Sequence, residues 1–199
     1  MMREINIVTE HGNVYGQAAG DPTSPLVLGV HGWSQRNGWN TWAPLLQPLG
    51  LAGFYAVSVD MPGWGKSLAW RKEPMDADEG VKALAAIIAG LDKTRASIMG
   101  KSWGGGIALK LAIQYPEMVR NLILSAPAYH EFDRLSELRQ PVLLAWSKDD
   151  PVIPYSFASS YTKVIPSIKL VTYESGGHSA GPKNADDFAP LAIELLLSS

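Results

Sequence analysis

The chain has 199 residues, 46% of them hydrophobic, and 17 basic against 19 acidic residues give a formal net charge of −2. This size and apolar content predict one domain, residues 1–199, with a single sizeable core. The nearly balanced charges argue against a nucleic-acid surface or a polybasic membrane anchor, and the absence of cysteine excludes disulfides and a cysteine nucleophile. No run approaches the length of a membrane span and the first residues lack an apolar signal core, so we expect a cytoplasmic protein. These features do not predict an oligomeric state.

Predicted strands and helices alternate along the chain. Two segments near the N-terminus, 3–8 and 13–18, are separated by a His-Gly-Asn turn and are predicted to form an antiparallel hairpin. Buried strands are predicted at 25–30, 54–59, 96–99, 121–125, 141–146 and 168–173. Helices are predicted at 41–49, 77–91, after Gly104 up to Pro116, and at 185–197, where Pro190 leaves the first turn uncertain. This alternation predicts a mostly parallel sheet with helices on both faces.

A G-x-S-x-G turn lies between a short apolar strand and a long apolar segment. It reads Gly100-Lys101-Ser102-Trp103-Gly104, the spacing of a nucleophile elbow, in which a serine sits on a strained strand-to-helix turn. Gly100 and Gly104 suit such a crowded backbone, because a Cβ there would clash. Gly105 and Gly106 would let the following helix approach the sheet closely. The alternative is a glycine-rich turn in which Ser102 has no chemical role.

A serine hydroxyl needs a base to remove its proton, and four histidines are available. His178 follows the last strand on a glycine-flanked loop and is the preferred base, although it could instead be a loop histidine that faces solvent. His130, after strand 121–125, is a second candidate. His11 belongs to the first hairpin and is predicted to lie on the surface.

A carboxylate should orient that base, and two adjacent aspartates follow strand 141–146. Asp150 is preferred, Asp149 is the alternative, and Asp133 is a distant third. Both adjacent aspartates could instead only cap the following helix. The order Ser102, Asp150, His178 is the serine-acid-histidine order expected for a nucleophile elbow in a parallel sheet.

The chain resembles the α/β-hydrolases in five segments that together span nearly all of it. They are the oxyanion-loop motif Val30-His31-Gly32-Trp33, the D-x-P-G-x-G-x-S turn from Asp60 to Ser67, the elbow, the acid loop from Asp150 to Pro154, and Gly177-His178. The resemblance implies an α/β-hydrolase fold and a small-molecule ester or acyl substrate. No G-x-G-x-x-G follows the first strand and no P-loop is present, so we expect no cofactor; four scattered histidines without cysteine make no ligand cluster, so we expect no metal.

The resemblance also implies roles for individual residues. The backbone amides of Trp33 and Trp103 would form the oxyanion hole, and their side chains would line the acyl pocket or only pack. His31 would support the oxyanion loop, with Gly32 beside it, and Asp60 would hold a turn. Trp64 and Trp70 are expected to be exposed, at a substrate rim or a partner surface.

Two departures from the family pattern bear on function. Ser147 stands where relatives commonly have glycine. Only residues 126–140 separate two strands between which many relatives insert a helical cap, so we expect an open, nearly capless site. The combined prediction is a cofactor-free serine hydrolase of carboxylesterase type, acting on small or accessible acyl groups. Serine at the elbow argues against the dehalogenase and epoxide-hydrolase branches. Thioesterase, amidase or lactonase activity, or a non-catalytic binding protein of the same fold, are the alternatives.

Overall fold

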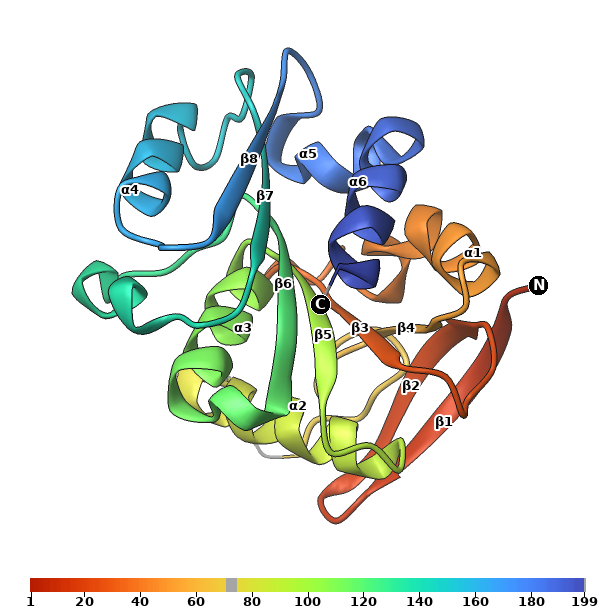
Figure 1. Ribbon diagram of the computed structural model, residues 1–199. Helices are drawn as coiled ribbons and strands as arrows, with labels where there is room; N and C mark the ends of the chain where they lie inside the picture. The colour runs from red at the N-terminus through yellow and green to blue at the C-terminus, as the bar shows by residue number, and fades with distance from the viewer. Residues whose placement is uncertain (71–74, 199) are drawn as a thin grey trace.

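The computed structural model describes residues 1–70 and 75–198 and has an eight-stranded sheet at its centre (Figure 1). The spatial order of the strands is β1-β2-β4-β3-β5-β6-β7-β8. The β1–β2 and β2–β4 pairs are antiparallel and all other neighbouring pairs are parallel. The strands are β1 (Arg3–Thr9), β2 (Gly12–Ala19), β3 (Leu26–Val30), β4 (Tyr55–Val59), β5 (Ala96–Lys101), β6 (Val119–Ser125), β7 (Val142–Ser147) and β8 (Ile168–Tyr173). The predicted N-terminal hairpin and mostly parallel sheet are confirmed.

Helices cover both faces of this sheet. The helices are α1 (Ala43–Leu51), α2 (Ala77–Gly90), α3 (Trp103–Gln114), α4 (Ala158–Thr162), α5 (Ala180–Lys183) and α6 (Ala185–Leu197). Apolar side chains of α2 and α3 belong to one buried cluster, and those of α1 and α6 belong to a second cluster. In Figure 1, α2 and α3 accordingly lie on one face of the sheet and α1 and α6 on the other. Helix α6 has the predicted bounds and continues through Pro190.

Helix α3 begins with glycines because it presses against the segment that follows β6. A Cβ at Gly106 would lie 2.0 Å from the carbonyl oxygen of Ala128, and one at Gly105 would lie 2.7 Å from the Cβ of Pro127. Glycine weakens a helix by about 1 kcal/mol relative to alanine, so close approach outweighs helix propensity here. This contact fixes the start of α3 against the carboxyl edge of the sheet.

The connection between β6 and β7 is short, as the sequence predicts. It contains one 3₁₀ helix, η3 (Phe132–Glu137), and no longer helix. Among the described residues, no helix is both long and apolar enough to cross a membrane.

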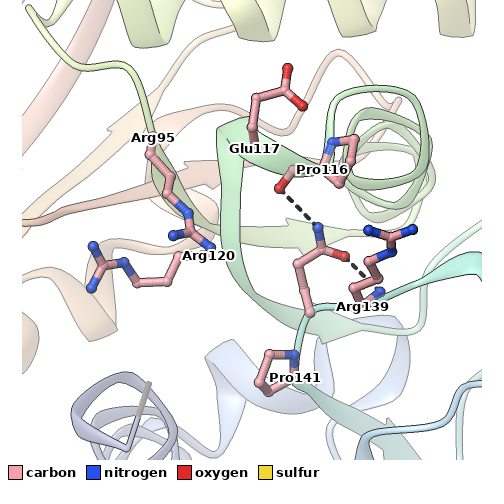
Figure 2. A pocket seen from close by; sticks show the side chains of 7 residues that line it. Arg95, Pro116, Glu117, Arg120, Arg139 and Pro141 are labelled. Carbon is pink, nitrogen blue, oxygen red and sulfur yellow. Dashed lines mark hydrogen bonds between the residues drawn. The ribbon is translucent and has the colours of Figure 1, made fainter.

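At the amino edge of the sheet, a cavity of about 550 Å³ lies beside the first residues of β5, β6 and β7 (Figure 2). Its lining includes Arg95, Arg120 and Arg139, and the side chain of Gln140 donates to the carbonyl of Pro116 at 3.1 Å. None of the predicted site residues lies there, because they follow the opposite ends of the strands.

Candidate active site

The predicted site residues gather at the carboxyl edge of the parallel strands. Ser102 follows β5, Asp150 lies in the loop after β7, and His178 lies in the 3₁₀ helix η5 (Gly177–Ser179) after β8. His31 and Asp60 follow β3 and β4 directly. Carboxyl ends of parallel strands share one edge of a sheet, which is where sites of such folds form.

Ser102 has the backbone conformation of a strained turn. Its φ of 52° and ψ of −121° are unusual for a residue with a side chain, and it is the N-cap of α3. A Cβ at Gly100 would lie 2.6 Å from the Cα of Gly105, and a Cβ at Gly104 would lie 2.4 Å from the carbonyl oxygen of His31. Both glycines are therefore required by the tight strand-turn-helix connection that presents Ser102.

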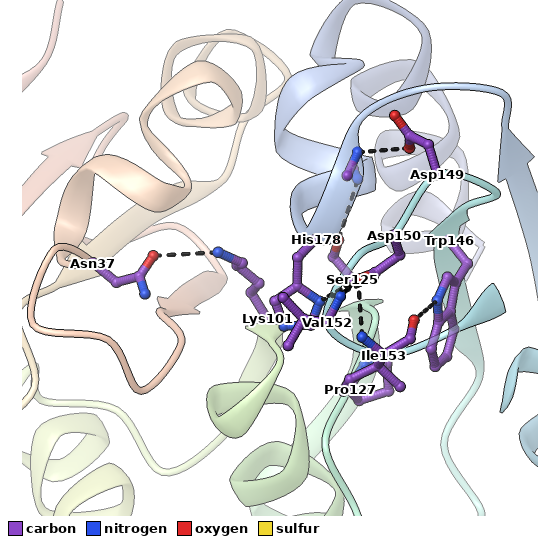
Figure 3. Close-up of polar contacts among 12 residues, drawn as sticks. Asn37, Lys101, Ser125, Pro127, Trp146, Asp149, Asp150, Val152, Ile153 and His178 are labelled. Carbon is purple, nitrogen blue, oxygen red and sulfur yellow. Dashed lines mark hydrogen bonds and ion pairs between the residues drawn. The ribbon is translucent and has the colours of Figure 1, made fainter.

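His178 and Asp150 form a close pair. The Nδ1 atom of His178 lies 2.9 Å from Oδ2 and 3.2 Å from Oδ1 of Asp150, whose side chain is 0% exposed (Figure 3). Oδ1 of Asp150 also accepts hydrogen bonds from the amides of Val152 and Ile153 at 2.8 and 3.0 Å. Asp150 therefore holds the turn that follows it and contacts the imidazole at the same time.

Asp149 contacts the histidine loop at a different point. Its Oδ1 accepts a hydrogen bond from the backbone amide of Gly177 at 2.8 Å, whereas the imidazole contacts belong to Asp150 (Figure 3). The two aspartates thus have separate roles, one toward the backbone of the loop and one toward the ring.

The second ring nitrogen of His178 is the atom that could accept a proton. When Nδ1 donates to Asp150, Nε2 of the neutral ring is an acceptor. This Nε2 is shielded from solvent and has no hydrogen-bond partner in the part of the chain that the structure describes. The Ser102 hydroxyl is thus not hydrogen-bonded to it in this structure; in unliganded sites such bonds are often long and tighten on substrate binding.

Ser125, the last residue of β6, connects the elbow to the histidine loop. Its carbonyl accepts from the amide of Ser102 at 3.0 Å, and its hydroxyl accepts from the amide of Gly181 at 3.3 Å. Gly181 is only three residues beyond His178, so both loops are attached to the same strand end. The sequence analysis did not single out Ser125, because a serine at a strand end carries no distinctive signal.

Two backbone amides beside Ser102 are available as donors. Trp103 is the first residue of α3, where backbone N–H groups have no intrahelical acceptor. No protein acceptor among the described residues takes a hydrogen bond from the amide of Trp33 or that of Trp103. Gly32, adjacent to Trp33, lies against the nucleophile, since a Cβ on it would be 3.4 Å from the Cβ of Ser102.

His31 is buried beneath this loop and is neutral. Its Nε2 accepts from the amide of Met61 at 3.0 Å, so Nδ1 carries the hydrogen and donates to the carbonyl of Gly32 at 2.7 Å. Burial lowers the pKa of His31 below its ordinary 6.5. Both ring nitrogens are occupied by these bonds, so His31 braces the loops after β3 and β4.

Asp60 fixes the same two loops. Its Oδ1 accepts from the amide of Trp39 at 2.8 Å, its Oδ2 from the amide of Lys66 at 2.9 Å, and its carbonyl from the Ser67 hydroxyl at 2.6 Å. Both hydrogen bonds of its carboxylate come from loop backbone amides, which is the contact pattern of a structural aspartate.

A tryptophan cluster formed by Trp33, Trp64 and Trp103 lies over the same loops. Its ring centroids are 5.1 to 5.2 Å apart, and Trp64 Nε1 donates to the carbonyl of Trp33 at 2.9 Å. Trp64 is only 4% exposed, whereas Trp33 is 46% exposed. The expectation that Trp64 is an exposed aromatic is therefore wrong: it is stacked on Trp103 inside the cluster. Trp70 is half-buried against His11.

None of the remaining histidine or aspartate candidates makes a hydrogen bond or ion pair to His178 or Asp150 among the described residues, although His130 lines the apolar cavity that Val152 and Ile153 also line. His11 is in the first hairpin, and the side chains of His130 and Asp133 are exposed after β6. Ser147, where relatives commonly have glycine, is buried and packs closely on the histidine loop, since a Cβ at Gly176 would be 2.6 Å from its hydroxyl. No group of three or more His, Cys, Asp or Glu side chains suited to a metal ion occurs within residues 1–70 and 75–198.

An apolar cavity of about 280 Å³ lies between the segments that follow β6 and β7. Its lining includes Pro127, Phe132, Ile153 and Tyr161. The same segment is tied to the elbow, because the amide of Ala128 donates to the carbonyl of Ser102 at 2.9 Å. The cavity is thus adjacent to the nucleophile turn.

Comparison with known proteins identifies the fold family of the chain. A family model described as the alpha/beta hydrolase fold matches residues 25–137. The chain is 32% identical over 120 residues to epoxide hydrolase 3 of Xenopus tropicalis, a match that covers 58% of this chain and 32% of that protein. It is 31% identical over 114 residues to a 2-hydroxy-6-oxononadienedioate/2-hydroxy-6-oxononatrienedioate hydrolase of Escherichia coli K12, with 57% and 38% covered. The matches thus span less than two-fifths of the length of these relatives.

Structural comparison extends the likeness to the whole chain. The crystal structure of a predicted CIB-like hydrolase from Thermoplasma acidophilum superposes with a TM-score of 0.90 and 23% identity, covering 100% of this chain and 99% of that one. At this identity the likeness concerns the fold. Because the family model matches more than half of the sequence, the chain belongs to the α/β-hydrolase fold family.

Proposed function

We propose that the protein is a serine hydrolase that cleaves carboxylic esters of small or accessible acyl groups through an acyl-enzyme intermediate. The observation that carries this proposal is the His178–Asp150 pair, whose Nε2 is buried and unpartnered among the described residues. The loop of His178 follows β8 at the same carboxyl edge of the sheet as the strained elbow of Ser102. Serine, base and carboxylate in these positions are the components of nucleophilic acyl transfer.

In the first half of the reaction, the Ser102 hydroxyl attacks the ester carbonyl and its proton passes to Nε2 of His178. The negative charge that develops on the carbonyl oxygen is held by the amides of Trp33 and Trp103, each worth about 3 kcal/mol in a dry site. The tetrahedral intermediate collapses, the C–O bond to the alcohol breaks, and the alcohol leaves with the proton from His178. Asp150 stabilises the positive charge that His178 carries while it holds this proton.

In the second half, His178 removes a proton from water, which attacks the acyl-enzyme. The second tetrahedral intermediate releases the carboxylic acid and returns the proton to Ser102. The products are one acid and one alcohol, and no cofactor is consumed.

The surroundings favour small or accessible acyl groups. The apolar cavity beside the elbow has a volume of about 280 Å³, just below the range of small-molecule sites, about 300–1,000 Å³. The short η3 connection provides little cover over the carboxyl edge, which supports an open, nearly capless site. Thioesters, amides and lactones would use the same groups, and substrate screening distinguishes them.

Epoxide hydrolysis, suggested by the name of one relative, is not favoured. The epoxide-hydrolase branch has aspartate as the nucleophile at the elbow, whereas this chain has Ser102 there. We therefore keep ester hydrolysis as the proposed activity.

The direct test is the Ser102→Ala variant assayed with 4-nitrophenyl butyrate. We expect hydrolysis to fall by about 10³-fold or more, with circular dichroism and thermal unfolding unchanged, because the hydroxyl makes no hydrogen bond in the described structure. Ser136→Ala, at an exposed serine of η3, is the matched control. Ester hydrolysis retained by folded Ser102→Ala protein would overturn the assignment.

A further inference from the structure

A second cavity near the elbow is lined by charged and polar side chains, in contrast to the apolar cavity described above. It has a volume of about 230 Å³ and lies between the loop after β3, the end of β5 and α5. Three cationic residues, Arg36, Lys101 and Lys183, line it, and no acidic residue does. Such a concentration of one sign of charge attracts an anion.

Lys101 is the least usual of these residues because it is almost fully buried. It is 8% exposed, and its Nζ donates to Oδ1 of Asn37 at 3.2 Å (Figure 3). No carboxylate among the described residues lies within ion-pair distance of it. Burial lowers the pKa of Lys101, with the charge of nearby Asp150 opposing this shift.

The positive charge of the buried Lys101 ammonium is only partly compensated, because its single hydrogen-bond acceptor, Asn37, is neutral. Lysine has three N–H donors, and a charge removed from water is costly unless it is paired and hydrogen-bonded. Asp150, the nearby carboxylate, is already bonded to His178 and to two backbone amides. The remaining donors of Lys101 are therefore available to an anion from outside the chain.

The cavity adjoins the nucleophile and the base. Lys101 directly precedes Ser102, and Ser179, which also lines the cavity, directly follows His178. A Cβ at Gly32 would lie 3.4 Å from Nδ2 of Asn37 and 3.4 Å from Cβ of Ser102. Asn37, which accepts from Lys101, and Ser102 are thus both immediate neighbours of Gly32.

We propose that this cavity is an anion subsite, which binds a carboxylate or phosphate group carried by the ester substrate. Lys101 would donate from the buried wall, Arg36 and Lys183 from the exposed rim, and the Ser179 hydroxyl from beside the base. The volume accommodates one such group with a few waters. This inference rests on the proposed function and narrows its substrate class to anionic esters.

The test compares matched ester pairs that differ by one charge. For the acyl half, 4-nitrophenyl hydrogen adipate and 4-nitrophenyl hexanoate have equal length and end in a carboxylate or a methyl group. For the alcohol half, 3-carboxyphenyl hexanoate and 3-methylphenyl hexanoate differ only in carrying a carboxylate or a methyl group on the phenyl ring. The readout is the ratio of kcat/KM between the anionic and the neutral member of each pair, measured for each variant.

The variants separate the subsite from general charge effects. Lys101→Met removes the buried cation. Lys183→Met removes an exposed cation of the same cavity and replaces Lys101→Met in the test if that variant does not fold. Lys163→Met, at an exposed lysine after α4, removes the same charge elsewhere. We expect the anionic-to-neutral ratio of one pair to fall about tenfold in Lys101→Met and less in Lys183→Met, and to stay unchanged in Lys163→Met. The pair that responds identifies which half of the substrate carries the anion.

Two results would contradict the proposed anion subsite, and they can be distinguished from each other. If the neutral esters are hydrolysed and both ratios are the same in wild type, Lys101→Met and Lys183→Met, the anion subsite is refuted and the serine hydrolase stands. If none of the four esters is hydrolysed and a fluorophosphonate probe does not label Ser102, the proposed function fails and the subsite fails with it.

Discussion

Asp149 and Asp150 show how two identical neighbouring side chains acquire different roles. Asp150 is fully buried against the imidazole of His178, whereas Asp149 receives the amide of Gly177. Their order in the sequence does not reveal this difference, because either carboxylate could reach the histidine loop. The three-dimensional turn after β7, closed by the amides of Val152 and Ile153, aims one of them at the ring.

We predict that Asp150→Asn lowers kcat/KM for 4-nitrophenyl butyrate by about 10³- to 10⁴-fold, since an amide nitrogen cannot accept from Nδ1–H of His178. The asparagine oxygen can still accept from Val152 and Ile153, so the fold should persist. Asp149→Asn is the matched control and should cost less than about tenfold, because it keeps an acceptor for a backbone amide. Equal losses in the two variants, measured under the same conditions, would show that Asp150 has no special role.

The positions of residues that belong to a sequence motif can be predicted from the sequence. The burial of residues whose neighbours come from distant loops cannot. Ser102, His178 and Asp150 follow strands at recognisable spacings, and the structure places all three at one edge. The burial of Trp64 cannot be predicted from its turn, because the rings that it packs against, Trp33 and Trp103, come from other loops. The burial of Lys101 likewise depends on contacts from another loop, since its Nζ donates to Asn37.

At the scale of elements, the loops after β3 and β4 behave as one unit. His31 links them through the amide of Met61 and the carbonyl of Gly32, and Asp60 links them through the amides of Trp39 and Lys66. The proposed oxyanion donor of Trp33 belongs to this unit. Its position therefore depends on a neutral, buried histidine.

This dependence predicts an effect of pH on stability. Burial lowers the pKa of His31 in the folded protein below its ordinary 6.5, so the unfolded chain binds a proton more readily. The stability contributed by neutral His31 is fully present above pH 6.5 and is lost as the pH falls from 6.5 toward the lowered pKa, with a slope of at most about 1.4 kcal/mol per pH unit.

Urea unfolding at pH 8, 7, 6 and 5 measures this loss. The difference in free energy of unfolding between wild type and His31→Gln should shrink as the pH is lowered, because the variant lacks the titrating ring. His130→Gln, at an exposed histidine, is the control. A wild-type-minus-variant difference that is constant over this pH range would contradict a buried, neutral His31.

The whole molecule follows from the sequence in outline. Apolar runs with β-branched residues predict the strands, and their alternation with helices predicts the parallel sheet, which the strand order confirms. Strand ends were less predictable: β5 extends to Lys101 because it pairs with Ser125 of β6, a long-range contact. The glycines of α3 were predicted to allow close packing, but their partners, Pro127 and Ala128, are visible only in the fold.

The central claim is that the edge of the sheet holds an activated serine. Labelling with a fluorophosphonate probe, followed by mass spectrometry of the modified peptide, tests it most directly, because only a serine whose proton is removed by a base reacts quickly. We predict one adduct on Ser102, lost in His178→Ala and kept in His130→Ala. Folded wild-type protein that forms no adduct on Ser102 would contradict the account and favour a non-catalytic binding protein of the same fold.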